Sequence, residues 1–320
     1  MRLTTTFPIP AAPVSMNHRS RVLTMGSCFA ASMGSRLSKL PLEVMTQPLG
    51  TLFHPFAITR ALSGEVSEDL YEHGGYFLHP DYHSIFTATS SADLLEDIRS
   101  VANEASTFVA SSDFLILTWG TSFSYFDKHL NKSVANCHKM PADRFEKRLS
   151  TVDEIVRDFS SLLSSLPSTT QVVLTVSPVR HTKDGMMENQ VSKSTLRVAA
   201  DIVSKQFENV HYFPAYEIMM DELRDYRFYE ADMIHPNEQA QDYIWERLMA
   251  TYFDQELQTI VKKWDSIYRT LAHRPHPAKL IDHRRVLEVL LAELNTEKYQ
   301  EIDTCKIAEY VAHEIKNTYI

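Results

Sequence analysis

The chain has 320 residues, of which 44% are hydrophobic and 23% are charged, with only 8 glycines and 14 prolines. This composition excludes disordered, collagen-like and low-complexity proteins, and the length is sufficient for one large domain with a smaller appendage. The formal net charge of −9 argues against a protein that mainly binds nucleic-acid phosphates or an anionic membrane surface. We therefore expect neither nucleic acid nor a membrane among its partners.

The three cysteines, Cys28, Cys137 and Cys305, include no CxxC pair. A disulfide framework or a cysteine-rich zinc module is therefore not expected, and reduced thiols fit a cytoplasmic protein. The sequence contains no apolar run of signal-peptide length and none of the roughly 20 residues that span a membrane. We expect a cytoplasmic protein that binds no metal and no other cofactor.

Predicted strands and helices alternate through most of the chain. The expected elements, in chain order, are a strand at 21–25, a helix to about residue 40, a strand at 42–45, a helix at 53–62, a β-hairpin or irregular excursion at 70–90, a helix at 92–105, a strand at 114–119, an inserted hairpin at 120–141, a helix at 150–166, a strand at 171–178, a helix at 192–207 and a strand at 211–213. This alternation predicts an α/β fold with a doubly wound parallel sheet.

The last part of the sequence has a different pattern. From Asn237 onward we expect only helices, with a break at the RPHP segment 274–277 and a last helix from about Ile302. We therefore expect an α/β domain over residues 1–255 and a C-terminal helical extension over residues 256–320.

Ser27 and Cys28 follow the first predicted strand and begin a helix. Unpaired backbone N–H groups and the helix dipole at that point favour an alkoxide, a thiolate or a developing oxyanion. An exposed Cys28 would have a lowered thiol pKa there. The alternative is that Ser27 only caps the helix and that Cys28 is a small core residue.

Asp232 and His235 lie three residues apart, just before a helix whose start is marked by Pro236. A short loop can present both side chains on one side, so the carboxylate can orient the imidazole. The imidazole can then take a proton from a hydroxyl or thiol, which is the logic of a nucleophile–His–Asp triad. The alternative is a surface ion pair beside a helix cap.

Several phrases of the sequence resemble one family. TMGSCFA at 24–30 resembles the name-giving motif of the GSCFA-domain family. Other segments similar to that family are PLGTLFHP (48–55), NCHKMP (136–141), SPVRHTKDG (177–185), YFPAYEIMMDELRDYRFY (212–229) and DMIHP (232–236). The resemblance covers about residues 20–250.

The family is identified as a member of the SGNH (GDSL-type) hydrolase-like superfamily. That resemblance implies a three-layer α/β/α, flavodoxin-like domain with a nucleophile after the first strand, a glycine after the second, an asparagine after a later strand and a DxxH motif. Asp232 and His235 match the DxxH motif, and Gly50 matches the glycine. A gapless match of G-S-C to the superfamily's G-D-S selects Cys28 as the nucleophile, whereas a shift by one residue selects Ser27; we favour Cys28 and keep Ser27 as the alternative.

The sequence departs from the superfamily at its G-x-N-D block, because Gly120 is followed by Thr and Ser and no Asn. Asn136 is our substitute oxyanion donor, with His138 beside it in the same polar cluster; a turn residue is the alternative for Asn136. Arg180 and His181 follow a predicted strand end. They are expected either to bind an anionic or carbonyl-bearing substrate group or to lie in a solvated loop.

These residues together favour an acyl-ester or thioester hydrolase, or an acyltransferase, that forms a covalent acyl-enzyme intermediate. The expected partner is a small-molecule or glycan acyl substrate. Two other classes stay open: a catalytically silent domain that binds an acylated or carbohydrate-like ligand, and an interaction scaffold built on the helical tail. No feature of the sequence sets the acyl donor, the acceptor or the oligomeric state.

Overall fold

The computed structural model describes residues 4–296, 299 and 302–317. Its strands are β1 (Arg21–Gly26), β2 (Glu43–Thr46), β3 (Tyr71–His73), β4 (Tyr76–Leu78), β5 (Thr87–Ala88), β6 (Phe114–Trp119), β7 (Phe123–Asp127), β8 (Lys132–Val134), β9 (Phe145–Leu149), β10 (Gln171–Val176) and β11 (Val210–Tyr212). Its α-helices are α1 (Cys28–Leu37), α2 (Pro55–Ser63), α3 (Ser91–Ala110), α4 (Val152–Ser165), α5 (Met186–Gln206), α6 (Ala215–Glu217), α7 (Glu238–Tyr252), α8 (Gln255–Ala272), α9 (Leu280–Leu294) and α10 (Cys305–Asn317).

Within the described residues, five parallel strands form the central sheet in the order β2-β1-β6-β10-β11. Numbered along the chain, this order is 2-1-3-4-5, the order of a flavodoxin-like doubly wound sheet. The direction of winding reverses between β1 and β6. In such sheets this switch point is where a crevice opens at the carboxyl ends of the strands, so the residues after β1 and β6 are placed for ligand binding.

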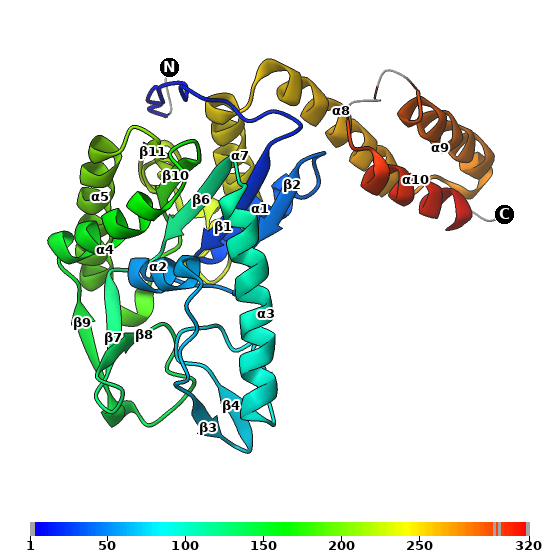
Figure 1. Cartoon of the computed structure of the whole chain (residues 1–320). Helices are drawn as coiled ribbons and strands as arrows, with labels where there is room; N and C mark the ends of the chain where they lie inside the picture. Colours follow the sequence, from blue (N-terminus) through cyan, green and yellow to red (C-terminus); the bar gives the residue numbers. More distant parts are fainter. Residues whose placement is uncertain (1–3, 297–298, 300–301, 318–320) are drawn as a thin grey trace.

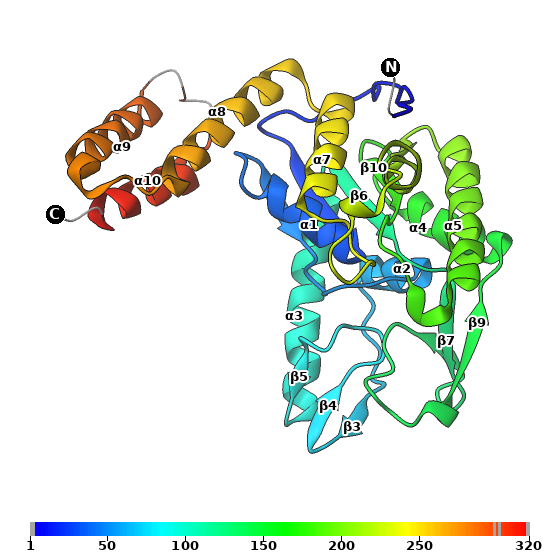
Figure 2. The same ribbon diagram turned by 180° about the vertical axis from the view of Figure 1, so that it is seen from behind.

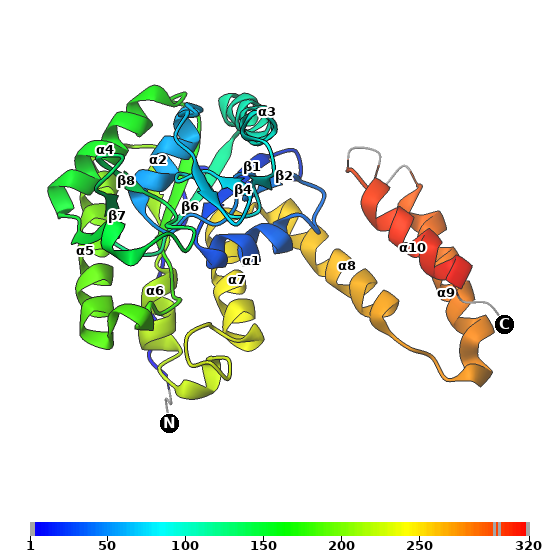
Figure 3. The same ribbon diagram turned by 90° about the horizontal axis from the view of Figure 1, so that it is seen from below.

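The alternation of side chains along the strands produces two cores, one on each face of the sheet. Val22 and Ile116 belong to the core that includes α1 and α7, whereas Leu23 and Leu117 belong to the core that includes α2, α3, α4 and α5. Figure 3 shows α1 and α7 on one side of the sheet and α2 and α4 on the other. The fold is therefore a three-layer α/β/α sandwich, and the predicted α/β class is confirmed.

Two small antiparallel sheets lie at the carboxyl end of the parallel sheet (Figure 1). One, β3-β4-β5, is formed by the aromatic segment at 70–90, which confirms the excursion predicted there. The other, β8-β7-β9, contains the predicted hairpin after β6. The sequence analysis missed β9, because FEKRL has little apolar alternation and four of its five residues are exposed. The β8-β7-β9 sheet supplies part of the wall of a cavity beside the candidate site.

Three long helices follow the α/β sandwich at the C-terminal end. Figures 1 and 2 show α9 and α10 beyond α8, away from the central sheet. The segment that enters α8 is held to the N-terminal part of the chain, because Asp254 N–H donates to Met16 O at 3.0 Å. The Tyr268 hydroxyl of α8 also donates to Lys39 O at 3.2 Å, just after α1. Within the described residues, no helix is both long and apolar enough to cross a membrane.

Candidate active site

The turn between β1 and α1 depends on a glycine. Gly26 has a φ of +136°, and a Cβ at this position would lie 2.1 Å from the carbonyl oxygen of Thr118 in β6. The next residue uses that same oxygen, because Ser27 N–H donates to Thr118 O at 3.1 Å. Only glycine fits this close approach of two strands, so the turn brings the start of α1 directly to the switch point.

The side chain of Gln47, after β2, holds the same turn from the other side. Its Nε2 donates to the carbonyls of Gly26 and Ser27, both at 2.9 Å, and its Oε1 accepts from Gly26 N–H at 3.0 Å. The sequence analysis missed Gln47. It adjoins the PLGTLFHP segment that carries part of the family resemblance, but nothing in its local pattern shows which backbone it contacts.

Ser27 and Cys28 have different environments. Ser27 is fully buried, and its Oγ accepts a hydrogen bond from Phe29 N–H at 3.3 Å as the N-cap of α1. Cys28 is the first residue of the helix and is partly exposed. The structure therefore leaves Cys28 as the more accessible of the two side chains.

The Cys28 thiol has a raised pKa, contrary to the lowered value expected at an exposed helix N-terminus. Burial is the largest cause and disfavours the thiolate. The backbone N–H groups of Cys28 and Phe29 and the charge of Lys193 act in the opposite direction, and the charge of Asp232 adds to the increase. The thiol therefore stays protonated at neutral pH and needs a base to react.

Asp232 and His235 form a hydrogen-bonded pair in the loop before α7. His235 Nδ1 donates to Asp232 Oδ2 at 2.7 Å, while Asp232 Oδ1 accepts from the N–H groups of Ile234 at 2.8 Å and His235 at 3.0 Å. The backbone N–H of His235 and its imidazole are the largest causes that lower the pKa of Asp232 to about 2. With an ionised carboxylate on Nδ1, the imidazole keeps Nε2 as its basic atom.

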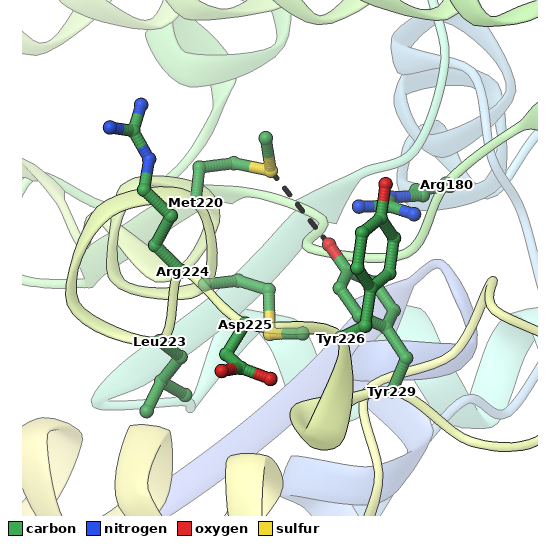
Figure 4. Close-up of a pocket in the computed structure, with 8 residues that line it drawn as sticks. Arg180, Met220, Leu223, Arg224, Asp225, Tyr226 and Tyr229 are labelled. Carbon is green, nitrogen blue, oxygen red and sulfur yellow. Dashed lines mark hydrogen bonds between the residues drawn. The ribbon is translucent and has the colours of Figure 1, made fainter.

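Arg180 braces this loop from the end of β10. Its backbone N–H donates to Ile234 O at 3.2 Å, and its Nη1 donates to Met233 O at 3.3 Å. The guanidinium lies 3.9 Å from the ring centre of Tyr229, and Figure 4 shows it beside the rings of Tyr226 and Tyr229. A small cavity of about 180 Å³ adjoins these residues. Arg180 is thus engaged in positioning the Asp232–His235 loop.

Lys193 is a buried cation under the switch point that the sequence analysis missed. Its Nζ donates to Gly120 O at 2.7 Å and to Ser177 O at 2.8 Å, the residues that follow β6 and β10. Burial lowers its pKa to about 7, and Cys28 lies close enough to oppose that decrease. Its position between Asn189 and Leu196 on the buried face of α5 was the available signal, because lysine is rare on such a face.

His181 lies near the charges of Lys193 and His235 and also lines a neighbouring cavity. Burial, followed by the charge of Lys193, lowers its pKa to about 4, and the charge of His235 contributes in the same direction. Its ring packs edge-on against Phe53 with 5.4 Å between ring centres. Its buried Nε2 has no hydrogen-bond partner among the described residues. This neutral imidazole has an unused nitrogen, which a polar substrate group can reach only after a local movement exposes it.

Asn136 and His138 lie with His181 in the lining of a cavity of about 730 Å³. Asn136 Oδ1 accepts from His138 N–H at 2.9 Å, so its amide nitrogen is the group left for a ligand. His138 Nε2 donates to His79 O at 2.8 Å, and burial is the main cause of its lowered pKa. His138 thus forms part of the cavity wall.

Gly50 lies in the turn after β2 with a φ of +78°, where a Cβ would lie 2.3 Å from Cβ of His83. Its N–H donates to Gln47 O at 2.9 Å and is therefore already engaged within the turn. An oxyanion bound there would have to share this hydrogen bond.

The structure brings Cys28, Asp232, His235, His181 and Lys193 to one edge of the sheet, where their charges influence one another. In the described part of the chain, no hydrogen bond joins Cys28 or Ser27 to His235. Catalytic hydrogen bonds are often long before substrate binds, and proton transfer here would require the Cys28 and His235 side chains to approach each other. Among the described residues there is also no cluster of three or more His, Cys, Asp or Glu side chains suited to a metal ion.

The fold and the site together define a three-layer α/β/α protein with a thiol at its topological switch point and an Asp–His pair at the same edge. A model of the GSCFA family matches residues 21–248. The chain therefore belongs to the GSCFA family. No curated protein matches the sequence.

Proposed function

We propose that this GSCFA-family protein is a hydrolase of esters or thioesters, or an acyltransferase, that forms an acyl-enzyme intermediate on Cys28. The supporting observation is that a protonated thiol at a helix N-terminus shares the carboxyl edge of the sheet with an imidazole oriented by a carboxylate. The resemblance to the SGNH hydrolase-like superfamily agrees with this assignment. A nucleophile, a base and an orienting acid are the components of covalent acyl transfer.

The reaction proceeds in two balanced steps. His235 Nε2 takes the Cys28 proton as Sγ attacks the acyl carbon, and the bond to the leaving alcohol or thiol breaks as His235 returns that proton to it. Water or an acceptor hydroxyl then attacks the thioester, again through His235, and releases the acyl group and the free thiol. The N–H groups of Cys28 and Phe29, which already favour a negative charge on Sγ, are the proposed oxyanion donors, and Phe29 N–H would have to share its hydrogen bond to Ser27 Oγ. The Asn136 amide is the candidate third donor.

Cys28 is preferred over Ser27 because Ser27 is fully buried and its Oγ is used to cap α1. A Ser27 nucleophile would require that cap to open. The alternative is kept as an outcome of the experiment below.

The test is intact-protein mass spectrometry after exposure to a panel of activated acyl esters and thioesters. We expect an acyl adduct on the wild type, loss of the adduct in Cys28→Ala and in His235→Ala, and its retention in Ser27→Ala. Cys137→Ala is the matched control, since burial raises the pKa of that partly buried thiol to about 11 and makes it a poor nucleophile. An adduct that persists in Cys28→Ala and disappears in Ser27→Ala would transfer the role to Ser27.

A second candidate function is ligand binding without turnover. It is favoured by two observations: the raised pKa of the Cys28 thiol and the engaged N–H of Gly50. If no donor in the panel gives an adduct while the protein is folded by circular dichroism, this second function replaces the first.

A further inference from the structure

The cavity of about 730 Å³ beside the candidate active site is much larger than a short acyl group needs. Its volume lies within the range of roughly 300–1,000 Å³ that is typical of small-molecule sites. The hairpin β7-β8, the loop after β8, the start of β9 and the loop at 181–184 form its lining. It therefore has room for the main body of a substrate.

Two contacts connect this cavity to the reacting residues. His181 lines the cavity, and the backbone N–H of the preceding Arg180 donates to Ile234 O, next to His235. Phe53 is also in the lining, and its carbonyl oxygen accepts a hydrogen bond at 2.8 Å from the N–H of Gly120, the residue that follows β6. The cavity is thus bordered by segments that are hydrogen-bonded to the His235 loop and to the end of β6, although Cys28 and His235 themselves are not in its lining.

The cavity lining carries an excess of positive charge in a chain whose net charge is −9. Lys147 is already paired with Asp184, the only acidic residue in the lining, at 2.6 Å. Lys139 and Lys183 are exposed lining residues, and within the described residues neither forms an ion pair. Lys183 lies close enough to Cys137, another lining residue, for its charge to act against the raised pKa of that thiol. Two ammonium groups are therefore available to an anionic ligand.

Aromatic side chains provide the apolar part of the lining. Phe53, Tyr125 and Phe145 all border the cavity. The ring of Phe123 is covered by Lys147, whose Nζ lies 4.0 Å from the ring centre. A ligand with an apolar or planar body and a charged end matches this combination of aromatic surfaces and ammonium groups.

We propose that the cavity binds an acyl substrate whose body carries a phosphate or carboxylate group, and that Lys139 and Lys183 contact this anion. The aromatic rings contact the apolar portion, and His181 lies between the anion and the reacting carbonyl. The inference rests on the proposed function for the acyl group, whereas the anion site itself does not require Cys28 to react. Lysine suits such a ligand because its ammonium acts as a point charge for an anion.

The test is isothermal titration of the full chain with three probes that cannot acylate it. Desulfo-coenzyme A carries phosphates, glutaramate carries a carboxylate with an unactivated amide and no ester, and pantetheine is neutral. We expect at least one anionic probe to bind more tightly than pantetheine. The double variant Lys139→Gln/Lys183→Gln should raise its Kd about tenfold or more, because a charge-assisted hydrogen bond contributes at least that much. The double variant Lys205→Gln/Lys262→Gln, which removes two exposed lysines outside the cavity, is the matched control.

Tight binding of desulfo-coenzyme A identifies a phosphate-bearing substrate, and tight binding of glutaramate alone identifies a carboxylate. The proposal is overturned if neither anion binds more tightly than pantetheine, or if the two double variants lose affinity equally. Failure of the acyl-enzyme mechanism would appear separately, as the absence of a Cys28 adduct with intact anion binding.

Discussion

At the scale of single residues, the hydrogen bond between Asp232 and His235 determines which imidazole nitrogen can act as a base. Because the pKa of Asp232 is lowered to about 2, its carboxylate is ionised across the whole neutral range and holds the proton on Nδ1. Asp232→Asn offers an amide in place of that charge, so the imidazole loses both its preferred tautomer and the stabilisation of its protonated form.

We expect Asp232→Asn to lower the rate of acyl-adduct formation by about 10²–10⁴-fold. The rate is measured by quenched-flow mass spectrometry at pH 7. Asp225→Asn is the matched control, since Asp225 is paired with Arg227 at 2.8 Å in the same exposed segment and should leave the rate unchanged. Equal rates for Asp232→Asn and wild type would remove Asp232 from the mechanism.

The buried Lys193 makes the free energy of unfolding depend on pH. Its pKa is about 7 in the folded protein, below the ordinary value of 10.5, because burial disfavours the ammonium. Between these two values the unfolded chain binds more protons than the folded one, so this group makes stability rise with pH by up to about 1.4 kcal/mol per pH unit. Below pH 7 both states are protonated and the contribution is constant.

In Lys193→Met, the free energy of unfolding should therefore rise less steeply between pH 7 and 9.5 than in the wild type. Urea denaturation at a series of pH values measures the slopes. Lys205→Met, which alters an exposed lysine on the same helix, should keep the wild-type slope. Parallel curves for Lys193→Met and wild type would show that Lys193 does not titrate in this range.

At the scale of elements, the site depends on how closely β1 and β6 approach each other at their carboxyl ends. Gly26→Ala would place a methyl group against a backbone oxygen that cannot move without breaking the sheet. We expect a loss of more than about 2 kcal/mol in the free energy of unfolding, from the clash and the positive φ together.

The matched control for Gly26→Ala is Gly74→Ala in the β3-β4 turn, where φ is +60° and no atom lies within 4 Å of the added Cβ. Only the backbone cost of about 1–2 kcal/mol remains there. Chemical denaturation of both variants measures the difference. Similar losses would mean that the strands can separate to accept a side chain.

At the scale of the whole molecule, the helices after α7 raise the question of where the α/β unit ends. Leu257, Ile260 and Val261 of α8 belong to the same core as Met16 and α1. Trp264 packs further along against Tyr299, with 6.0 Å between ring centres. The expected boundary at residue 255 thus stays a prediction, which truncation can test.

We expect deletion of 273–320 to lower Tm less than deletion of 255–320. The longer deletion uncovers apolar side chains on the α1 side of the sheet, each worth about 1.5–3 kcal/mol when buried. Differential scanning calorimetry of both truncated chains gives the comparison, and size-exclusion chromatography reports any aggregation. A folded protein of unchanged Tm without residues 255–320 would place the boundary at residue 255.

The sequence by itself determined the class of fold and the positions of the chemical groups. Alternating strand and helix periodicity predicted the doubly wound sheet, because that periodicity follows directly from which side chains are buried. It also placed Cys28, Arg180 and His181 directly after strands. The helix start at Ser27 and the DxxH loop likewise follow from local patterns.

Only the tertiary structure decided the environment of these groups. Desolvation raises the pKa of the Cys28 thiol, and it depends on atoms from distant parts of the chain. The Gln47 contacts with the nucleophile turn, the buried Nζ of Lys193 and the cavity that joins His181 to Asn136 likewise come from segments far apart in sequence. Local sequence patterns indicate whether a side chain is buried, whereas packing between elements determines which atoms surround it.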